Sequence, residues 1–142
     1  MFGKERVIVI GCGFLGSTLA SAISRQRFAV VVVDMKEASF DQLDQDYDGE
    51  TFSGDGSHPS VLREAGIQQA RYVIAATGSD TTNFLIAELS SEIFGVERVF
   101  ARIESHALAQ MLEDLGVSVI CPHLVCSRVV YSLMGLGSQG DE

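Results

Sequence analysis

The sequence predicts an α/β fold: a doubly wound sheet of six parallel strands in the order 3-2-1-4-5-6, with one extra helix at the C-terminal end. Apolar runs of strand length alternate with segments of helical periodicity along the whole chain. The strand runs are apolar at consecutive positions, which is typical of parallel strands covered by helices on both faces. At 142 residues and 46% hydrophobic, the chain has the size and composition of one compact domain.

The expected strands are short apolar runs: Arg6–Ile10, Ala29–Val33, Thr51–Ser53, Arg71–Ala76, Val99–Ile103 and Val117–Cys121. The expected helices follow them in order: Phe14–Gln26, Ala38–Tyr47, Pro59–Ala65, Thr81–Phe94, Ala107–Leu115 and Leu124–Met134. Gly66, Gly95 and Gly116 stand where three helices should end, in the position that favours left-handed backbone. Pro59 and Pro122 stand where two helices should begin, because a missing N–H costs nothing there. Residues 1–135 are expected to form the domain, and residues 136–142 a flexible, frayed tail.

The overall composition excludes several classes of protein. A net charge of −9 argues against nucleic-acid binding, which needs clustered Lys and Arg. The longest apolar runs have the length of strands and are too short to span a membrane, and the N-terminus has no signal-peptide pattern. Three cysteines without framework spacing fit a reducing compartment. We therefore expect a soluble, acidic, cytoplasmic domain.

The segment Gly11–Gly16 matches the pattern G-x-G-x-x-G, directly after a strand and at the start of a helix. In this pattern Gly11 allows a tight turn, Gly13 lets a phosphate approach the backbone, and Gly16 permits close packing of helix and strand. The N–H groups at the helix start favour a phosphate there. Asp34 ends the next strand, 23 residues after Gly11. Its carboxylate can accept both hydroxyls of an adenosine ribose and would repel a 2′-phosphate, so this Rossmann-like pattern favours NAD or an adenine nucleotide over NADP.

The loop after the third strand, "GDGSHP" from Gly54 to Pro59, reaches the same crevice. Its glycines keep the backbone open beside the expected adenine. Two roles remain open for Asp55. It either accepts a hydrogen bond from the adenine amino group, or it builds a turn and helix cap with Ser57 and Pro59.

The loops after the fourth and fifth strands supply further candidates. Thr77 and Gly78 fall at the topological switch point, across from the glycine loop, where ribose and phosphates can be contacted. Asp80 or Ser79 is expected to cap the next helix. Arg102 is a charge in a strand expected to be covered on both faces, so it needs a partner. That partner is either a ligand phosphate, or Glu104 or Asp80 in an ion pair.

The last helix carries apolar residues on more than one face, from Leu124 to Met134. Such a surface suggests a partner, so we expect a homodimer or higher homo-oligomer built through this helix; folding back onto its own sheet is the alternative. Cys121, His123 and Cys126 lie close together in sequence, but a structural zinc site needs a fourth ligand. We expect no metal site here; instead, Cys121 should end an apolar strand and Cys126 should face the core.

Catalytic residues are not evident. No Tyr-x-x-x-Lys pair exists, and no motif places His58, His106 or His123 at the crevice in a catalytic role. We therefore do not expect an enzyme. An NAD-dependent oxidoreductase and a stand-alone NAD or AMP sensor with another partner remain the alternatives.

With these motifs assembled, the chain resembles the nucleotide-binding N-terminal lobe of the RCK, or KTN, domains (TrkA N-terminal type) of Trk and Ktr potassium uptake proteins. The matching segments are "GCGFLG", Asp34, "GDGSHPSVLREAGI", "AATGSDTTN", "ARIES" and "LGVSVICP". The resemblance implies a cytoplasmic regulatory subunit, peripheral to the inner face of the membrane, that senses NAD(H), ADP, ATP or AMP and gates a potassium channel or transporter. It also implies that a helix near residues 123–135 crosses to a second protomer. Together with the motifs, it gives these candidate cofactor-binding residues: Gly11, Cys12, Gly13, Phe14, Leu15, Gly16, Asp34, Met35, Asp55, Gly56, Ala76, Thr77, Gly78 and Arg102.

Three departures from that family shape the expectation. Phe14 stands where some Ktr-like members have an Arg that meets a terminal phosphate. His123 stands where those members place an acid that helps hold a divalent ion. The family's smaller C-terminal lobe is expected to be missing from these 142 residues, which are then either a truncated piece of a longer protein or a short relative. The first two differences weaken the case for ATP with a metal and favour NAD(H), ADP or AMP.

Overall fold

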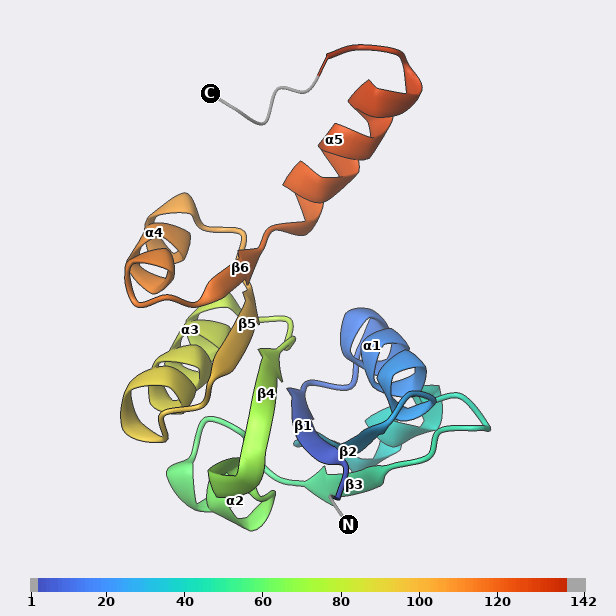
Figure 1. The fold of residues 1–142 in the computed structure, drawn as a ribbon, viewed down its shortest axis with the longest axis vertical. Helices are drawn as coiled ribbons and strands as arrows, with labels where there is room; N and C mark the ends of the chain where they lie inside the picture. Colours follow the sequence, from blue (N-terminus) through green and yellow to red (C-terminus); the bar gives the residue numbers. More distant parts are fainter. Residues whose placement is uncertain (1–2, 138–142) are drawn as a thin grey trace.

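The computed structural model describes residues 3–137, and much of the tail predicted for residues 136–142 lies outside them. Its sheet has six parallel strands in the order β3-β2-β1-β4-β5-β6, which confirms the predicted fold class (Figure 1). The strands are β1 (Glu5–Ile10), β2 (Phe28–Asp34), β3 (Glu50–Ser53), β4 (Ala70–Ala75), β5 (Arg98–Arg102) and β6 (Ser118–Ile120). Adjacent positions of β1 and β2 are apolar and buried, so both faces of these central strands are covered.

The α-helices are α1 (Phe14–Ser24), α2 (Pro59–Glu64), α3 (Asp80–Glu88), α4 (His106–Asp114) and α5 (Pro122–Leu133). Shorter helical turns are η1 (Glu37–Gln42), η2 (Ile67–Gln69) and η3 (Leu89–Ile93), of which η3 is a π-helix that continues α3. Gly66, Gly95 and Gly116 have φ values of 91°, 62° and 85°, so the helix ends predicted from these residues are confirmed. Pro59 and Pro122 occupy the first positions of α2 and α5, also as predicted.

One predicted helix is wrong in length. The segment 38–47 forms only the single 3-10 turn η1, and Leu43 already has extended backbone. Side-chain contacts with neighbouring elements take the place of further helical turns. The backbone N–H of Asp44 donates to Ser21 Oγ at 3.1 Å, and the Tyr47 hydroxyl donates to the Glu50 carbonyl at 2.6 Å. These bonds fix the segment in an irregular path that a helix could not follow.

Two buried layers lie on opposite faces of the sheet. α2, α3 and α4 contribute Leu62, Ile86 and Leu112 to one layer, which also contains Ile8 and Val31. On the other face, α1 and η1 cover the residues of β1 and β2 that alternate with these. The helices α2, α3 and α4 therefore all pack on one side of the sheet.

Consequently, the α1 side of β4, β5 and β6 has no helix over it among residues 3–137. The prediction that helices cover both faces is correct for β1 and β2 and wrong for this half of the sheet. Tyr72, Ile74 and Phe100 are half-buried there, and Ile120 is 40% exposed. With one stripe of α1 they line a groove of about 450 Å³, which we call the apolar groove: Val7, Leu15, Leu19, Ile23, Phe28, Tyr72, Ile74, Ala75, Phe100, Ala101, Arg102 and Ile120.

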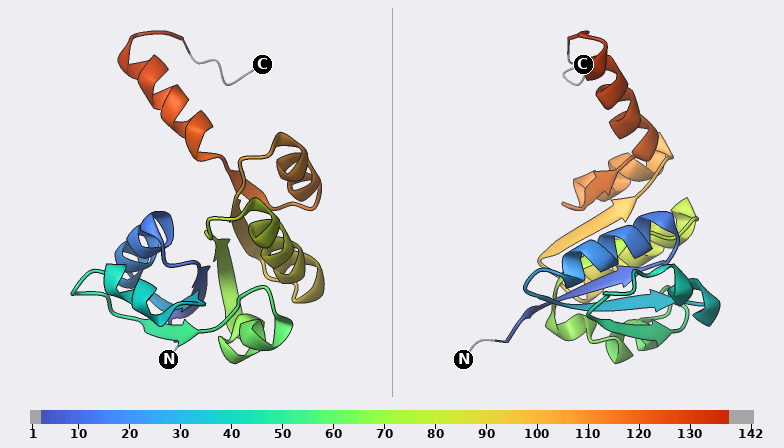
Figure 2. Two further views of the ribbon diagram at one scale, coloured as in Figure 1. Left: turned by 180° about the vertical axis from the view of Figure 1, so that it is seen from behind. Right: turned by 90° about the vertical axis from the view of Figure 1, so that its right-hand side faces the viewer.

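Helix α5 does not fold back onto this surface. It extends away from the sheet beyond β6 in each view (Figures 1 and 2), and none of its residues is buried. Leu133 is 83% exposed, and Val129 is 52% exposed. Cys126 is exposed on the same helix, so the expectation that it faces the core is wrong. Apolar side chains on α5 thus remain uncovered within the described chain.

Candidate functional site

A cleft of about 740 Å³ opens where β1 and β4 end, at the point where the chain passes from one half of the sheet to the other. Every predicted binding residue except Gly16 lines it. The sequence reasoning missed several lining residues, which follow a predicted residue directly, lie in η1 or α3, or begin α5: Lys36, Ser39, Gln42, Ser79, Thr82 and Pro122. Lys36 and Arg102 are the two cationic side chains among the residues that line the cleft.

The three fingerprint glycines have different structural roles. Gly11 has φ +103°, and a Cβ there would lie 2.7 Å from the Ala76 carbonyl oxygen. A Cβ on Gly16 would lie 1.7 Å from the Gly11 carbonyl oxygen, so this glycine serves the packing of α1 against the loop. A Cβ on Gly13 would meet nothing within 4 Å. The open space at Gly13 therefore belongs to the cleft itself.

The N-terminus of α1 faces the cleft without a side-chain cap. Gly13 is the N-cap residue, and it supplies no side-chain acceptor for the first N–H groups of the helix. The first N–H groups of a helix have no partner within the helix, and they carry its partial positive charge. Phe14 and Leu15, the first two residues of α1, line the cleft directly beside them. This end of the cleft can therefore bind an anionic group such as a phosphate.

Asp34 ties the glycine loop to the end of β2. Its Oδ2 accepts a hydrogen bond from the Cys12 N–H, and its Oδ1 accepts one from the Lys36 N–H, both at 2.8 Å. A carboxylate has about four acceptor sites, so two such bonds leave capacity for ribose hydroxyls. Burial, and then the charge of Asp34, raise the pKa of the Cys12 thiol to about 11. Cys12 is thus a neutral, buried thiol at physiological pH.

The loop that follows β3 contains the turn expected for Asp55 but not the helix cap. Asp55 Oδ1 accepts from the N–H and the hydroxyl of Ser57, at 2.9 and 2.6 Å, which closes a turn. These hydrogen bonds lower the pKa of Asp55, and His58 lies 3.3 Å from its other oxygen. α2 itself has no side-chain cap. Asp55 therefore holds its loop while it also lines the cleft.

Asn83 organises the floor of the site, and the sequence reasoning gave it no role. Its Oδ1 accepts from the N–H and the hydroxyl of Thr77, at 2.9 and 2.6 Å. Its Nδ2 donates to the carbonyls of Thr77 and Arg102, at 3.0 and 2.8 Å. The residue is only 1% exposed. A single amide thus joins the ends of β4 and β5. The sequence feature that could have indicated this role is a polar residue on the buried helical stripe that also contains Ile86 and Ala87.

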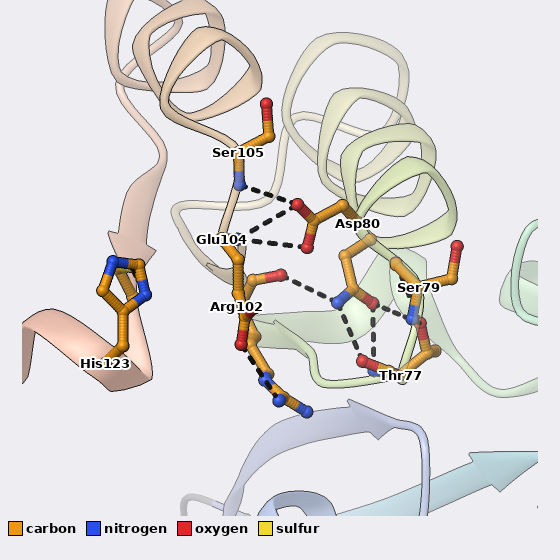
Figure 3. A network of polar contacts seen from close by, with 9 residues as sticks. Thr77, Ser79, Asp80, Arg102, Glu104, Ser105 and His123 are labelled. Atoms are coloured by element: carbon orange, nitrogen blue, oxygen red, sulfur yellow. Dashed lines mark hydrogen bonds and ion pairs between the residues drawn. The ribbon is translucent and has the colours of Figure 1, made fainter. Parts of the chain in front are cut away.

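Arg102 ends β5 on the open side of the sheet, which explains how a charge is tolerated there. Its Nη2 lies 3.5 Å from Glu104 Oε1, and this is the one ion pair it makes among the described residues (Figure 3). Asp80 does not pair with it. Asp80 instead accepts from the N–H groups of Glu104 and Ser105 at 3.1 and 2.8 Å. The contact with Glu104 is long and solvent-exposed, so it competes weakly with a bound anion.

Two of the remaining expectations concern the cap of α3 and the Cys121–His123–Cys126 segment. Ser79, not Asp80, caps α3 by accepting from the Thr82 N–H at 3.3 Å. Cys121 Sγ lies 3.0 Å from His123 Nδ1. Within residues 3–137, no three His, Cys, Asp or Glu side chains come together as a metal site would need. None of the helices in this range combines the length and the apolar character required to cross a bilayer.

Residues 7–122 match the family model of the TrkA-N domain. The chain belongs to the TrkA-N family. It is 36% identical over 114 residues to the Trk system potassium uptake protein TrkA of Streptomyces coelicolor, which is 80% of this chain and 51% of that protein. It is 33% identical over 122 residues to the TrkA of Vibrio alginolyticus, covering 84% of this chain and 27% of that protein. The chain therefore spans about half, or less, of the length of these relatives.

Solved structures support the same fold. The TrkA-N domain of the inner membrane protein YbaL from Escherichia coli superposes with a TM-score of 0.81 at 15% identity, over 94% of this chain and 99% of that one. The GsuK channel bound to NAD superposes with a TM-score of 0.73 at 18% identity, over 89% of this chain and 23% of that one. GsuK has also been solved bound to ADP. The TM-scores show that the YbaL domain and GsuK share the fold of this TrkA-N chain.

Proposed function

We propose that this chain is the nucleotide-binding regulatory domain of a Trk-type potassium uptake system. Nucleotide in the cleft would set the activity of a membrane potassium transporter or channel, which the domain contacts at the cytoplasmic face. The observation that carries the proposal is the glycine loop joined to Asp34 at the switch point of the sheet. The Trk system relatives and the RCK domain of GsuK support the regulatory part.

NAD(H) or an adenine nucleotide is the ligand that these residues favour. The uncapped start of α1 suits a phosphate or pyrophosphate, and Arg102 adds a cation beside it. The carboxylate of Asp34 suits free ribose hydroxyls and repels a 2′-phosphate. NAD and ADP bound to GsuK support the same two ligand classes.

A regulator fits the cleft better than an oxidoreductase does. Hydride transfer needs a proton donor or acceptor placed against the substrate. Among the described residues that line the cleft, none is His or Tyr, and Asp34 and Asp55 are already held by backbone N–H groups. The thiol of Cys12 has a pKa raised to about 11. Binding without such chemistry supports a sensor.

We further propose that the domain is a homodimer in which α5 of one copy lies in the apolar groove of the other. α5 has no buried residue, and its exposed side chains include Leu124, Val129 and Leu133. The groove is lined mainly by aliphatic and aromatic side chains. Ile120 lies in the groove and is separated only by Cys121 from Pro122, where α5 begins. A two-fold arrangement would then cover both apolar surfaces in one exchange.

The test of ligand binding is calorimetry and thermal shift of the 142-residue chain with NAD, NADH, NADP, ATP, ADP and AMP. We expect NAD(H) or an adenine nucleotide to bind better than NADP. Asp34→Ala should weaken that binding at least tenfold, roughly the loss of one or two charge-assisted hydrogen bonds. Asp48→Ala, an exposed acid away from the cleft, is the matched control and should bind like the parent. No binding by any of these nucleotides would refute the proposal.

A further inference from the structure

Leu15 belongs to two surfaces at once. It lines the nucleotide cleft as the second residue of α1, and it begins the apolar stripe with Leu19 and Ile23 that forms one wall of the apolar groove. Ala75 and Phe100 line the same groove from strands β4 and β5. The side chain is half-buried, so ligands on both sides can reach it. From this shared wall we infer that Leu15 couples nucleotide binding in the cleft to docking of α5 from a second copy in the groove.

The inference rests on the proposed function and adds the residue that links its two parts. A nucleotide phosphate at the start of α1 would lie against the first helical turn, where Leu15 sits. A docked helix would press on the same turn from the groove. Close-packed interiors respond to such pressure by shifting between discrete packings rather than by deforming smoothly. The position of Leu15 is then shared by both binding events.

A second contact supports the same link. Pro122, the first residue of α5, lines the cleft, while Arg102 lines both the cleft and the groove. The helix that leaves one copy therefore starts at that copy's own nucleotide site. Arg102 is also held through its carbonyl by Asn83, on the floor of the cleft. Each copy would thus present both its outgoing helix and its receiving groove at the wall of one cleft.

Coupling of this kind is reciprocal. If nucleotide tightens dimerisation by some factor, dimerisation must tighten nucleotide binding by the same factor. For the parent chain we expect a factor of roughly 5 to 150, the usual range for allosteric coupling. Whether nucleotide strengthens or weakens dimerisation depends on which packing of α1 it favours. The magnitude of the coupling factor should depend on Leu15.

The experiment measures the monomer–dimer constant of the 142-residue chain by sedimentation, with and without the nucleotide that binds best in the titration above. Leu15→Ala should bring the coupling factor to within about twofold of one. Leu19→Ala, one helical turn further along, removes the same groups from the groove alone and should weaken the dimer while keeping the coupling factor. Met35→Ala alters only the cleft side and should also keep it. Leu15→Met, which nearly preserves volume, should restore most of the coupling.

The outcomes separate the two proposals. If nucleotide binds and dimers form, but the parent shows no coupling or Leu15→Ala keeps it in full, the inference is overturned and the proposed function stands. If no nucleotide binds, the proposed regulatory function and the inference fall together. If nucleotide binds but no dimer forms, the proposed dimer and the inference fall, and the proposed nucleotide-binding function stands. Leu15→Asn, which keeps the length and branching of the side chain but makes it polar, replaces Leu15→Ala if thermal melting shows that the alanine variant does not fold, and it should lose coupling equally.

Discussion

Removal of the Asn83 side chain should damage stability and binding together. Asn83→Ala deletes four hydrogen bonds of 2.6 to 3.0 Å at a residue that is 1% exposed. The Thr77 hydroxyl can turn to the Ser79 carbonyl, 3.3 Å away, but one backbone N–H and two carbonyls lose their partner. At about 1 kcal/mol for each of these three groups, the loss is about 3 kcal/mol. For a domain of this size that lowers Tm by roughly 6 to 12 °C.

The same change should reach the nucleotide, because Asn83 holds the backbone of both Thr77 and Arg102 at the cleft. We expect affinity to fall about tenfold, equivalent to one well-placed hydrogen bond. Differential scanning fluorimetry and calorimetry give the two values on the same sample. Thr81→Ala, an exposed change on the same helix, should alter stability by less than about 0.5 kcal/mol. An Asn83→Ala protein that melts within 2 °C of the parent, or binds nucleotide equally well, would refute the structural role given to this amide.

Three further predictions concern the glycine loop and the cysteines. Gly16→Ala forces a Cβ to 1.7 Å from the Gly11 carbonyl oxygen, and it should lower the free energy of unfolding by more than about 3 kcal/mol, measured by urea titration. Gly13→Ala, whose Cβ meets no atom within 4 Å, should leave stability nearly unchanged and weaken nucleotide binding. Because the pKa of the Cys12 thiol is raised from 9.0 to about 11, the neutral buried form stabilises the fold below pH 9, and this contribution is lost as pH rises through about 11. Cys12→Ala should therefore lose less stability than the parent between those pH values in thermal melts. At pH 8, a maleimide should label Cys126 promptly and Cys12 only after unfolding, and equal labelling rates would contradict its burial.

The parts of the fold that sequence predicted well are those governed by local rules. Consecutive apolar residues flanked by turn residues predicted all six strands, with ends within two residues of the observed ones. Positive φ at Gly66, Gly95 and Gly116 follows from the absence of a Cβ, so these helix ends needed no tertiary information. The glycine loop and Asp34 were found for a related reason. Their spacing reflects backbone geometry that only one arrangement of strand, turn and helix can satisfy.

The parts that sequence did not predict depend on contacts between distant segments. The segment 38–47 has residues that would permit a helix, but Ser21 and Glu50 offer its polar groups other partners. Asn83 was not assigned a role because its partners lie at the ends of two different strands, Thr77 just after β4 and Arg102 at the end of β5. Likewise, Asp80 carries an expected cap residue type, yet its carboxylate serves the loop before α4 rather than its own helix. In each case the hydrogen-bond partner of a side chain lies close to it only in the folded chain.

The open half of the sheet likewise depends on contacts that the sequence does not specify, here the proposed contacts with another copy of the chain. The alternate residues of β4 and β5 that face it, such as Tyr72, Ile74 and Phe100, are as apolar as those of a fully covered strand. Such a pattern indicates that this face of the sheet becomes buried, but it does not indicate whether the same copy or a second copy of the chain covers it. α5 shows the complementary case, an apolar helix with no surface beneath it in its own copy. One arrangement explains both features: α5 of one copy covers the open sheet face of a second copy, and the reverse. A weaker dimer in Leu19→Ala would support this arrangement, and an unchanged dimerisation constant would contradict it.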